Sequence, residues 1–252
     1  MNRFRIIPIL LIDEDGLVKG EKFKNHRYVG DPINAVKIFN DKEVDEITIL
    51  DIGASRENRS PNFDLIEELA GEAFMPLSYG GGLSNLDQVS RILKSGVEKV
   101  IFNHSAVHRP KLIRETADKF GSSSTVVSID VKSGGLFGGR KVFTLNGKEN
   151  IGKDPLAFAK EMEEIGAGEI ILTSIDKEGT QNGYDLKLIE HVSHEVGIPV
   201  IANGGAGNIQ HFKDAISAGA SAVAAGSFFV FQGPRKAVLI SYPSNEDLKS
   251  IY

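Results

Sequence analysis

The feature that most constrains this chain is an internal repeat in which short apolar runs end in glycines. The run PVIANGGAG at 199–207 corresponds to MPLSYGGGL at 75–83, an offset of 124 residues. A second pair of segments, 96–106 and 219–229, is offset by 123 residues. Such a repeat is sought first because it fixes the architecture. The two offsets predict a chain made of two similar halves.

Strand-like and helix-like segments alternate along both halves, which is typical of a parallel sheet. A chain of 252 residues has the usual size of one barrel domain. We therefore predict an α/β fold, a single (β/α)8 TIM barrel over residues 1–252 built from duplicated half-barrels at about 1–120 and 121–252. The strands are expected at 5–12, 46–52, 76–82, 99–103, 125–132, 169–176, 199–203 and 221–226. The helices are expected at 33–44, 63–73, 84–96, 111–121, 154–166, 185–197 and 208–219.

Three segments stand outside this alternation. Residues 13–32 read as a long loop, and loops of this length in compact domains are usually functional lids. Asp31 and Pro32 at its end predict a capped helix start. Asn146-Gly147 between β-prone arms predicts an extra hairpin within 138–152. The segment 232–252 carries no pattern that predicts a role.

Composition excludes several classes of function. The net charge is −5 and the 29 basic residues are scattered, which argues against a nucleic-acid partner. The chain has no cysteine, which excludes disulfides, thiolate catalysis and cysteine metal sites. Acids follow the first apolar run at once, so it reads as a core strand and not as a signal peptide. With no apolar segment long enough to span a bilayer, we expect a cytoplasmic protein without a membrane partner.

The glycine-ended strands predict phosphate binding. Glycines after a buried strand let the backbone come within hydrogen-bonding distance of a ligand. In (β/α)8 barrels the loops after strands seven and eight form a phosphate site at a helix N-terminus. Because the pattern occurs once in each half, we expect two such sites on opposite sides of one barrel mouth. The implied substrate is a small molecule with a phosphate at each end.

Acids at the carboxyl ends of strands are the candidates for proton transfer, because barrel active sites lie at that face. They are Asp51, Asp130 and Asp176, and Asp130 directly follows the apolar run TVVSI. General acid-base work is the favoured role of Asp130, and capping of the next backbone turn is the alternative. At an offset of 119 residues the half-barrel repeat places Leu11 opposite Asp130, with Asp13 two positions further along the same face.

Taken together, ten motifs resemble the cyclase subunit of imidazole glycerol phosphate synthase, the HisF family, over essentially the whole chain. They are DGLVKG (15–20), VGDP (29–32), DEITILDIGAS (45–55), YGGG (79–82), EKVIFN (98–103), VVSID (126–130), GAGEIILTSID (166–176), GTQNGYD (179–185), NGGAG (203–207) and AAGSFF (224–229). The resemblance implies a barrel that takes ammonia from a HisH-like glutaminase. It then uses the ammonia to cleave and cyclise a bis-phosphorylated ribosyl nucleotide, without a cofactor or metal ion.

The resemblance also implies roles for individual residues. It places Asp130 on one catalytic aspartate, Lys19 on the lid lysine and Asn103 on an active-site polar position. Gly81, Gly82 and Asn103 are expected to border one phosphate site, and Gly204, Gly205 and Ser227 the other. From their places at strand ends, Asp51 is a further catalytic candidate and Asp176 a further candidate for binding the substrate.

The sequence departs from this family at the mouth of the barrel. Leu11 stands where the family has its other catalytic aspartate, and Ile9 stands where a cysteine is usual. His104 and Glu178 occupy positions where threonine and aspartate are expected. A leucine cannot move a proton, and loss of one of two acid-base groups lowers a rate by roughly 10²–10⁴.

Four charged residues at strand starts, Arg5, Glu46, Lys99 and Glu169, alternate in sign. One interpretation is a structural ion-pair plug, because converging buried charges are costly unless paired. The resemblance implies instead the gate through which ammonia enters. Because all four are present while the acid at position 11 is not, we expect a barrel that receives ammonia but makes a different product.

HisF-like paralogues of this kind work with a glutaminase and a sugar amidotransferase in bacterial surface-polysaccharide (O-antigen) pathways, where the nitrogen ends in an amidine. The segments IPILLI and GPRKAVLISYP resemble that subgroup. Three alternatives stay open. They are an ordinary cyclase in which Asp13 or Asp51 replaces the missing acid, a non-catalytic ammonia conduit that activates a glutaminase, and the sister isomerase of histidine synthesis.

Overall fold

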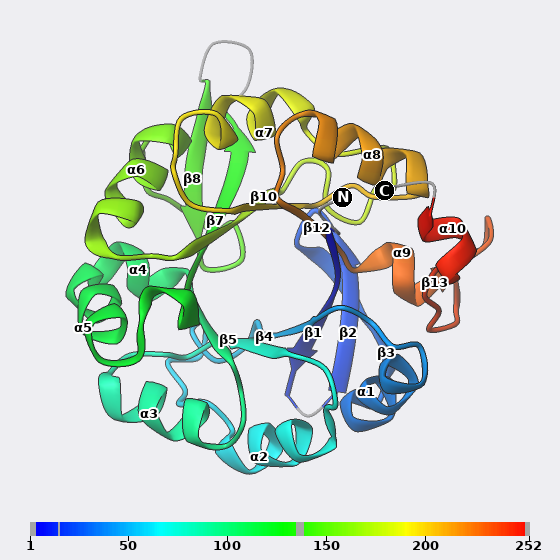
Figure 1. Cartoon of the computed structure of the whole chain (residues 1–252), viewed down its shortest axis with the longest axis horizontal. Coiled ribbons are helices and arrows are strands. Elements are labelled where there is room, and N and C mark those ends of the chain that lie inside the picture. The colour runs from blue at the N-terminus through cyan, green and yellow to red at the C-terminus, as the bar shows by residue number, and fades with distance from the viewer. Residues whose placement is uncertain (1–3, 15, 135–138, 250–252) are drawn as a thin grey trace.

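The computed structural model describes residues 4–14, 16–134 and 139–249. In these residues eight parallel strands form a closed ring with helices around it (Figure 1). The ring closes because β12 pairs with β1, and β7 with β10. In ring order the strands are β1 (Arg5–Asp13), β4 (Ile47–Asp51), β5 (Leu77–Gly80), β6 (Lys99–Phe102), β7 (Thr125–Ser133), β10 (Glu169–Ser174), β11 (Val200–Asn203) and β12 (Ala222–Ala225). The predicted (β/α)8 barrel is confirmed.

The outer helices cover the barrel with their apolar faces. They are α1 (Pro32–Asp41), α2 (Phe63–Glu72), α3 (Leu86–Lys94), α5 (Pro110–Phe120), α6 (Pro155–Ile165), α7 (Leu186–Ser193) and α8 (Ile209–Ser217). All except α5 begin at an Asp or Asn whose side chain accepts a hydrogen bond from a backbone N–H of the first turn. The predicted start of α1 at Asp31 and Pro32 is confirmed. A 3-10 turn, η1 (Ser122–Ser124), follows α5.

The two halves repeat each other in backbone detail. The capping residues Asn85 and Asn208, which begin α3 and α8, have φ/ψ of −156°/165° and −160°/172°. Short helices follow β6 and β12. They are α4 (His104–His108), which the sequence did not predict, and α9 (Ser227–Val230), where the sequence reads as a short helix. Equivalent caps and helices at equivalent places are what a duplicated half-barrel requires.

Side chains alternate between the two faces of each strand, as the period of two requires. On β1, Ile6, Leu10 and Ile12 belong to the large core beneath the helices. Ile7, Ile9 and Leu11 belong to a second cluster, together with Ile101, Val126, Ile171, Ile201, Ala222 and Ala224. This second cluster fills the inside of the barrel. The two clusters therefore separate the helical shell from the lumen.

Residues 13–32 were expected to form a loop, and this expectation was wrong. They form a hairpin of β2 (Gly16–Glu21) and β3 (Lys24–Gly30), in which β2 pairs antiparallel with the end of β1. Because β1 runs beyond the barrel rim, its free edge offers backbone groups to β2. Asp15 of the motif DGLVKG lies outside the described residues.

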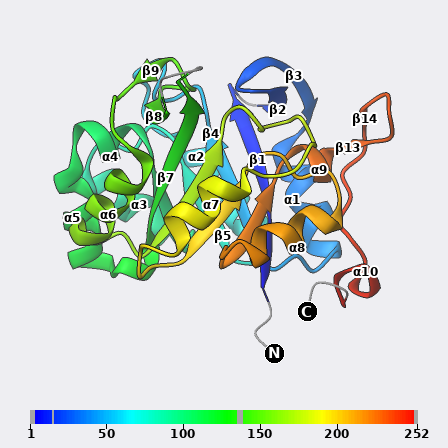
Figure 2. The same ribbon diagram turned by 90° about the horizontal axis from the view of Figure 1, so that it is seen from above.

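The second hairpin was predicted and is present, as β8 (Arg140–Thr144) and β9 (Glu149–Asn150). Gly138 of the expected range lies outside the described residues. Asn146 and Gly147 at its turn have φ of 57° and 72°, a region that asparagine and glycine tolerate. Figure 2 shows both hairpins at the same end of the barrel.

The segment after the barrel forms β13 (Phe231–Gln232), β14 (Ala237–Val238) and α10 (Asn245–Lys249) along its outer side (Figure 1). Tyr242 Oη anchors it by donating to the backbone oxygen of Ile6 at 3.1 Å. In the described residues, no helix is both long and apolar enough to cross a membrane.

Candidate active site

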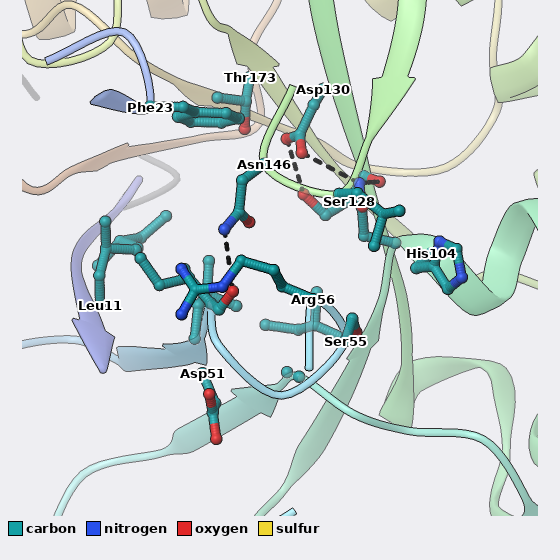
Figure 3. Close-up of a pocket in the computed structure, with 18 of the residues that line it drawn as sticks. Leu11, Phe23, Asp51, Ser55, Arg56, His104, Ser128, Asp130, Asn146 and Thr173 are labelled. Atoms are coloured by element: carbon teal, nitrogen blue, oxygen red, sulfur yellow. Dashed lines mark hydrogen bonds between the residues drawn. The ribbon is translucent and has the colours of Figure 1, made fainter. Parts of the chain in front are cut away.

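A pocket opens at the carboxyl ends of the barrel strands, beneath the two hairpins (Figure 3). Its walls include Leu11 from β1, Asp51 from β4, Asn103 after β6 and Asp130 from β7. Asn146 of the second hairpin reaches into it and donates from Nδ2 to the backbone oxygen of Ile52 at 2.9 Å. The sequence indicated this residue only as part of a turn. The turn in fact closes part of the barrel mouth.

Asp130 carries the clearest sign of chemistry in the pocket. Burial raises the pKa of its carboxyl to about 7, although hydrogen bonds from Thr173, Ser128 and Asn103 oppose the rise and the Glu178 charge adds to it. Asn103 Nδ2 lies 3.1 Å from Asp130 Oδ2. A carboxyl with a pKa near neutrality is suited to general acid-base work, because it takes up and releases protons readily.

Leu11 faces Asp130 from the other side of the pocket (Figure 3). It is 9% exposed and pairs with Leu50 of β4 and Val18 of β2. Apolar side chains therefore surround the position opposite the acid. Nothing at this position can donate or accept a proton.

Two further acids near the mouth, Asp13 and Asp51, are held by arginines. Asp13 is bound by Arg56, whose Nη2 lies 2.9 Å from Oδ1. Asp51, which lines the pocket, is bound by both terminal nitrogens of Arg59 at 3.0 and 3.1 Å. Its Oδ1 also accepts from the backbone nitrogens of residues 53 and 54, at 3.1 and 2.9 Å. Asp51 thus organises the loop after β4.

Lys19 is carried into the pocket by β2 and is buried. Its ammonium forms an ion pair with Glu178, which follows β10. Lys22 N donates to the backbone oxygen of Glu178 at 2.9 Å, so the hairpin is attached to this loop twice. A Cβ atom at Gly226 would lie 2.8 Å from Lys19 Nζ, so a larger residue there would require the lysine side chain to shift.

In the first half, Gly81 and Gly82 line the pocket beside Ser55. Their φ angles are 127° and 69°, and a Cβ on Gly81 would lie 2.4 Å from the backbone oxygen of Asp51. These glycines are therefore required by the close packing of two loops. That packing also brings their backbone to the pocket wall, next to Asn103 and His104.

The four residues expected at the second phosphate site do not line this pocket; they are Asp176, Gly204, Gly205 and Ser227. A Cβ on Gly205 would lie 2.2 Å from the backbone oxygen of Gly183, so loop packing also explains this glycine, and Gly204 is similar. Asp176 accepts from Ser133 N at 2.8 Å. Ser227 is buried, and its Oγ has no hydrogen-bond partner among the described residues. An unpartnered buried hydroxyl is uncommon.

At the opposite end of the barrel the four predicted charges come together in what we call the charge ring, Arg5, Glu46, Lys99 and Glu169. Arg5 Nη1 lies 2.6 Å from Glu46 Oε2, and Arg5 also pairs with Glu169. Lys99 Nζ lies 3.1 Å from Glu46 and 2.9 Å from Glu169. Ser78 Oγ donates to Glu46 at 2.8 Å. Both glutamates are buried and each contacts both cations.

Alternate side chains connect the charge ring to the pocket. Along β6 and the residue after it, the side chains on this face are Lys99, Ile101 and Asn103. Along β10 they are Glu169, Ile171 and Thr173. Ile101, Asn103 and Thr173 all line the pocket. The lumen between the two ends is thus lined by apolar side chains with a few hydroxyls.

His108 and Glu149 were not recognised as site residues from the sequence. They lie beside His104, and His108 Nε2 is 3.2 Å from Glu149 Oε2. The only signal in the sequence was the four-residue spacing of the two histidines.

Comparison with known proteins agrees with this architecture. Residues 5–234 match the model of a family described as "Histidine biosynthesis protein". The chain is 53% identical to the "Putative imidazole glycerol phosphate synthase subunit hisF2" of Pseudomonas aeruginosa, over 96% of this chain and 97% of that protein. It is 49% identical to the "Putative imidazole glycerol phosphate synthase subunit HisF" of Leptospira borgpetersenii over the full length of both. It is 42% identical to the "Imidazole glycerol phosphate synthase subunit HisF" of Nocardioides sp. over 90% of each.

Proposed function

The chain belongs to the HisF branch of the histidine biosynthesis protein family, and from that premise we propose that it is a synthase subunit that receives ammonia from a HisH-like glutaminase and serves amidine formation on a surface-polysaccharide sugar. The ammonia enters at the charge ring, crosses the lumen and reaches the pocket beside Asp130. A third protein, a sugar amidotransferase, uses the nitrogen.

The observation that carries this proposal is the contrast between a complete charge ring and an incomplete acid pair. The ring has two buried carboxylates that each contact Arg5 and Lys99. At the mouth, Asp130 faces Leu11, so one of the two acid-base positions of the cyclase reaction is missing. A barrel that delivers ammonia without this ring-forming step fits both facts.

The face around the charge ring offers a surface for a glutaminase. Phe74, in the loop before β5, is 88% exposed, and its backbone N–H donates to Asn40 Oδ1 at 2.9 Å. Large exposed aromatic side chains are favoured at the centres of protein interfaces. Because β5 starts at this end of the barrel, a glutaminase that docks here would release ammonia next to the ring.

Ordinary cyclase activity in histidine biosynthesis is the second candidate. It is favoured by the presence of Asp130, the buried Lys19 and the first-half glycines at one pocket, and by the name of the Nocardioides relative. Asp13 or Asp51 would have to replace the missing acid. Both are engaged by arginines, Arg56 and Arg59, which argues against either in that role.

The proposal is tested by reconstituting the protein with its glutaminase and supplying glutamine labelled with ¹⁵N in the amide. We expect transfer of label to a sugar acceptor when the amidotransferase is added, and none when the barrel subunit is left out. Free ammonium salt should bypass the glutaminase. Turnover of the bis-phosphorylated ribosyl nucleotide with the same label would instead support the cyclase.

A further inference from the structure

Two histidines project from one face of the short helix α4, at the edge of the pocket. His104 and His108 are four residues apart, which places them on the same side of a helix. Their ring centroids are 4.3 Å apart. His104 also lines the pocket, on the far side from Leu11 (Figure 3). His104 thus shares the pocket with Gly81 and Gly82.

A carboxylate from the second hairpin completes the group. Glu149 is held in the β8–β9 ladder opposite Thr144. Its Oε2 lies 3.2 Å from His108 Nε2 and 3.8 Å from His104 Nδ1. Thr144 Oγ1 lies 3.4 Å from His104 Nδ1 and donates to Asn103 Oδ1 at 2.8 Å. Two separate elements thus bring three donor side chains to one point.

We propose that His104, His108 and Glu149 form a binding site for a divalent cation of the zinc class. Two imidazoles and one carboxylate are a ligand set that zinc accepts with a fourth position left open. With metal–ligand distances of about 2.0–2.2 Å, donor atoms around a tetrahedral ion are separated by roughly 3.3 Å. Candidate donor atoms of these three residues all lie within 4.8 Å of one another. Small side-chain rotations would bring them to the metal.

The proposed site is open to solvent. All three side chains are partly exposed, so a cation reaches them from solvent.

The open coordination position would let a bound ion contact a ligand in the pocket. It would be filled by water or by an oxygen of an anion, and the first-half glycines lie next to His104 on the pocket wall. No metal site was expected from the sequence, because Glu149 is 41 residues from His108 in the chain.

The test uses the tag-free full chain, dialysed against a chelator and then titrated with zinc sulfate in a calorimeter. We expect one zinc ion per chain. His108→Ala and Glu149→Gln should each weaken binding at least about tenfold, since even residues outside the coordination shell often cost that much. His191→Ala, on α7, is the matched control and should bind as the unmodified chain does.

Cobalt gives a second measurement on the same proteins. Bound Co²⁺ should show the visible absorption of a nitrogen- and oxygen-ligated ion, and this absorption should be lost in His108→Ala. Thermal melts of each variant establish that it is folded. If the unmodified chain takes up no zinc, or if the His108 and Glu149 variants bind it as tightly, the three residues are only a hydrogen-bonded group and the proposal is wrong.

Discussion

The two ends of this barrel differ in the partners of their carboxyl groups. In the charge ring, each buried glutamate contacts both Arg5 and Lys99. At the mouth, Asp130 is bound by neutral side chains, and the position across from it is Leu11. A paired charge is held in place by the protein alone, whereas an acid with a pKa of about 7 is ready to exchange a proton with something that enters the pocket. Under the proposed function, ammonia entry at the charge ring and chemistry at the mouth would be able to change independently.

The largest expected effect comes from restoring the missing acid. Leu11→Asp should raise ammonia-dependent turnover of the bis-phosphorylated ribosyl nucleotide by roughly 10²–10⁴, the usual contribution of one acid-base group. Steady-state assays with ammonium salt measure it. Leu11→Asn is the matched control, since it has nearly the same shape but cannot carry a proton. Equal rates in the two variants would show that the missing acid is not what limits the cyclase reaction.

The next effect concerns the stability contributed by Asp130. Its pKa is about 7 in the folded chain against 3.8 for a free carboxyl, so between these values the folded chain binds the extra proton. The stabilisation is fully present below about pH 3.8 and is lost as the pH rises through about 7.

Relative to Asp130→Asn, the unmodified chain should therefore lose about 4 kcal/mol of unfolding free energy between acid and mildly alkaline pH. Denaturant titrations of both proteins across this range measure the difference. A difference that does not change with pH would mean that Asp130 titrates normally.

Removal of one ring cation should have a smaller effect. In Lys99→Ala both glutamates still contact Arg5, so we expect a loss of about 1–3 kcal/mol, as for a buried polar group left without one partner. If the charge ring is an ammonia gate, glutamine-dependent nitrogen transfer should fall while ammonia-dependent transfer is kept. Thermal melts measure the loss of stability, and assays with glutamine and with ammonium salt measure the two kinds of nitrogen transfer. Loss of stability with unchanged coupling would identify the ring as a structural plug.

The smallest effect is expected at the rim. Asp13→Asn breaks a partly exposed ion pair with Arg56, which contributes about 0–1 kcal/mol. Glutamine-dependent nitrogen transfer should not change, because Asp13 is bound by Arg56 and does not line the pocket. A large fall in cyclase turnover would instead show that Asp13 replaces the acid missing at position 11.

Much of the barrel could be predicted because its strands are continuous apolar runs repeated at a fixed offset. The hairpin at 16–30 could not, because its strands carry lysines and glycines and are stabilised mainly by pairing with the free end of β1. The short helix α4 was missed because five residues give too little periodicity to recognise. Boundaries of this kind depend on tertiary contacts more than on local preference.

The site was less predictable than the fold. The charges at strand starts could be placed because strand starts of a parallel barrel meet at one end. The ion pair of Lys19 with Glu178 could not, because it joins residues 159 positions apart through the hairpin. Asp176 was expected in the pocket because it lies at the carboxyl end of its strand, as Asp51 does, but its carboxylate instead accepts a hydrogen bond from the backbone nitrogen of Ser133. Equivalent positions in the two halves thus have different partners.

The most direct test of the account is ammonia-dependent turnover of the bis-phosphorylated ribosyl nucleotide by the purified, unmodified protein. Because Leu11 stands opposite Asp130, we predict little or no cyclised product even at saturating ammonium. A kcat of about 1 s⁻¹ or more, within the ordinary range of enzymes, would contradict the account and identify the protein as a working cyclase.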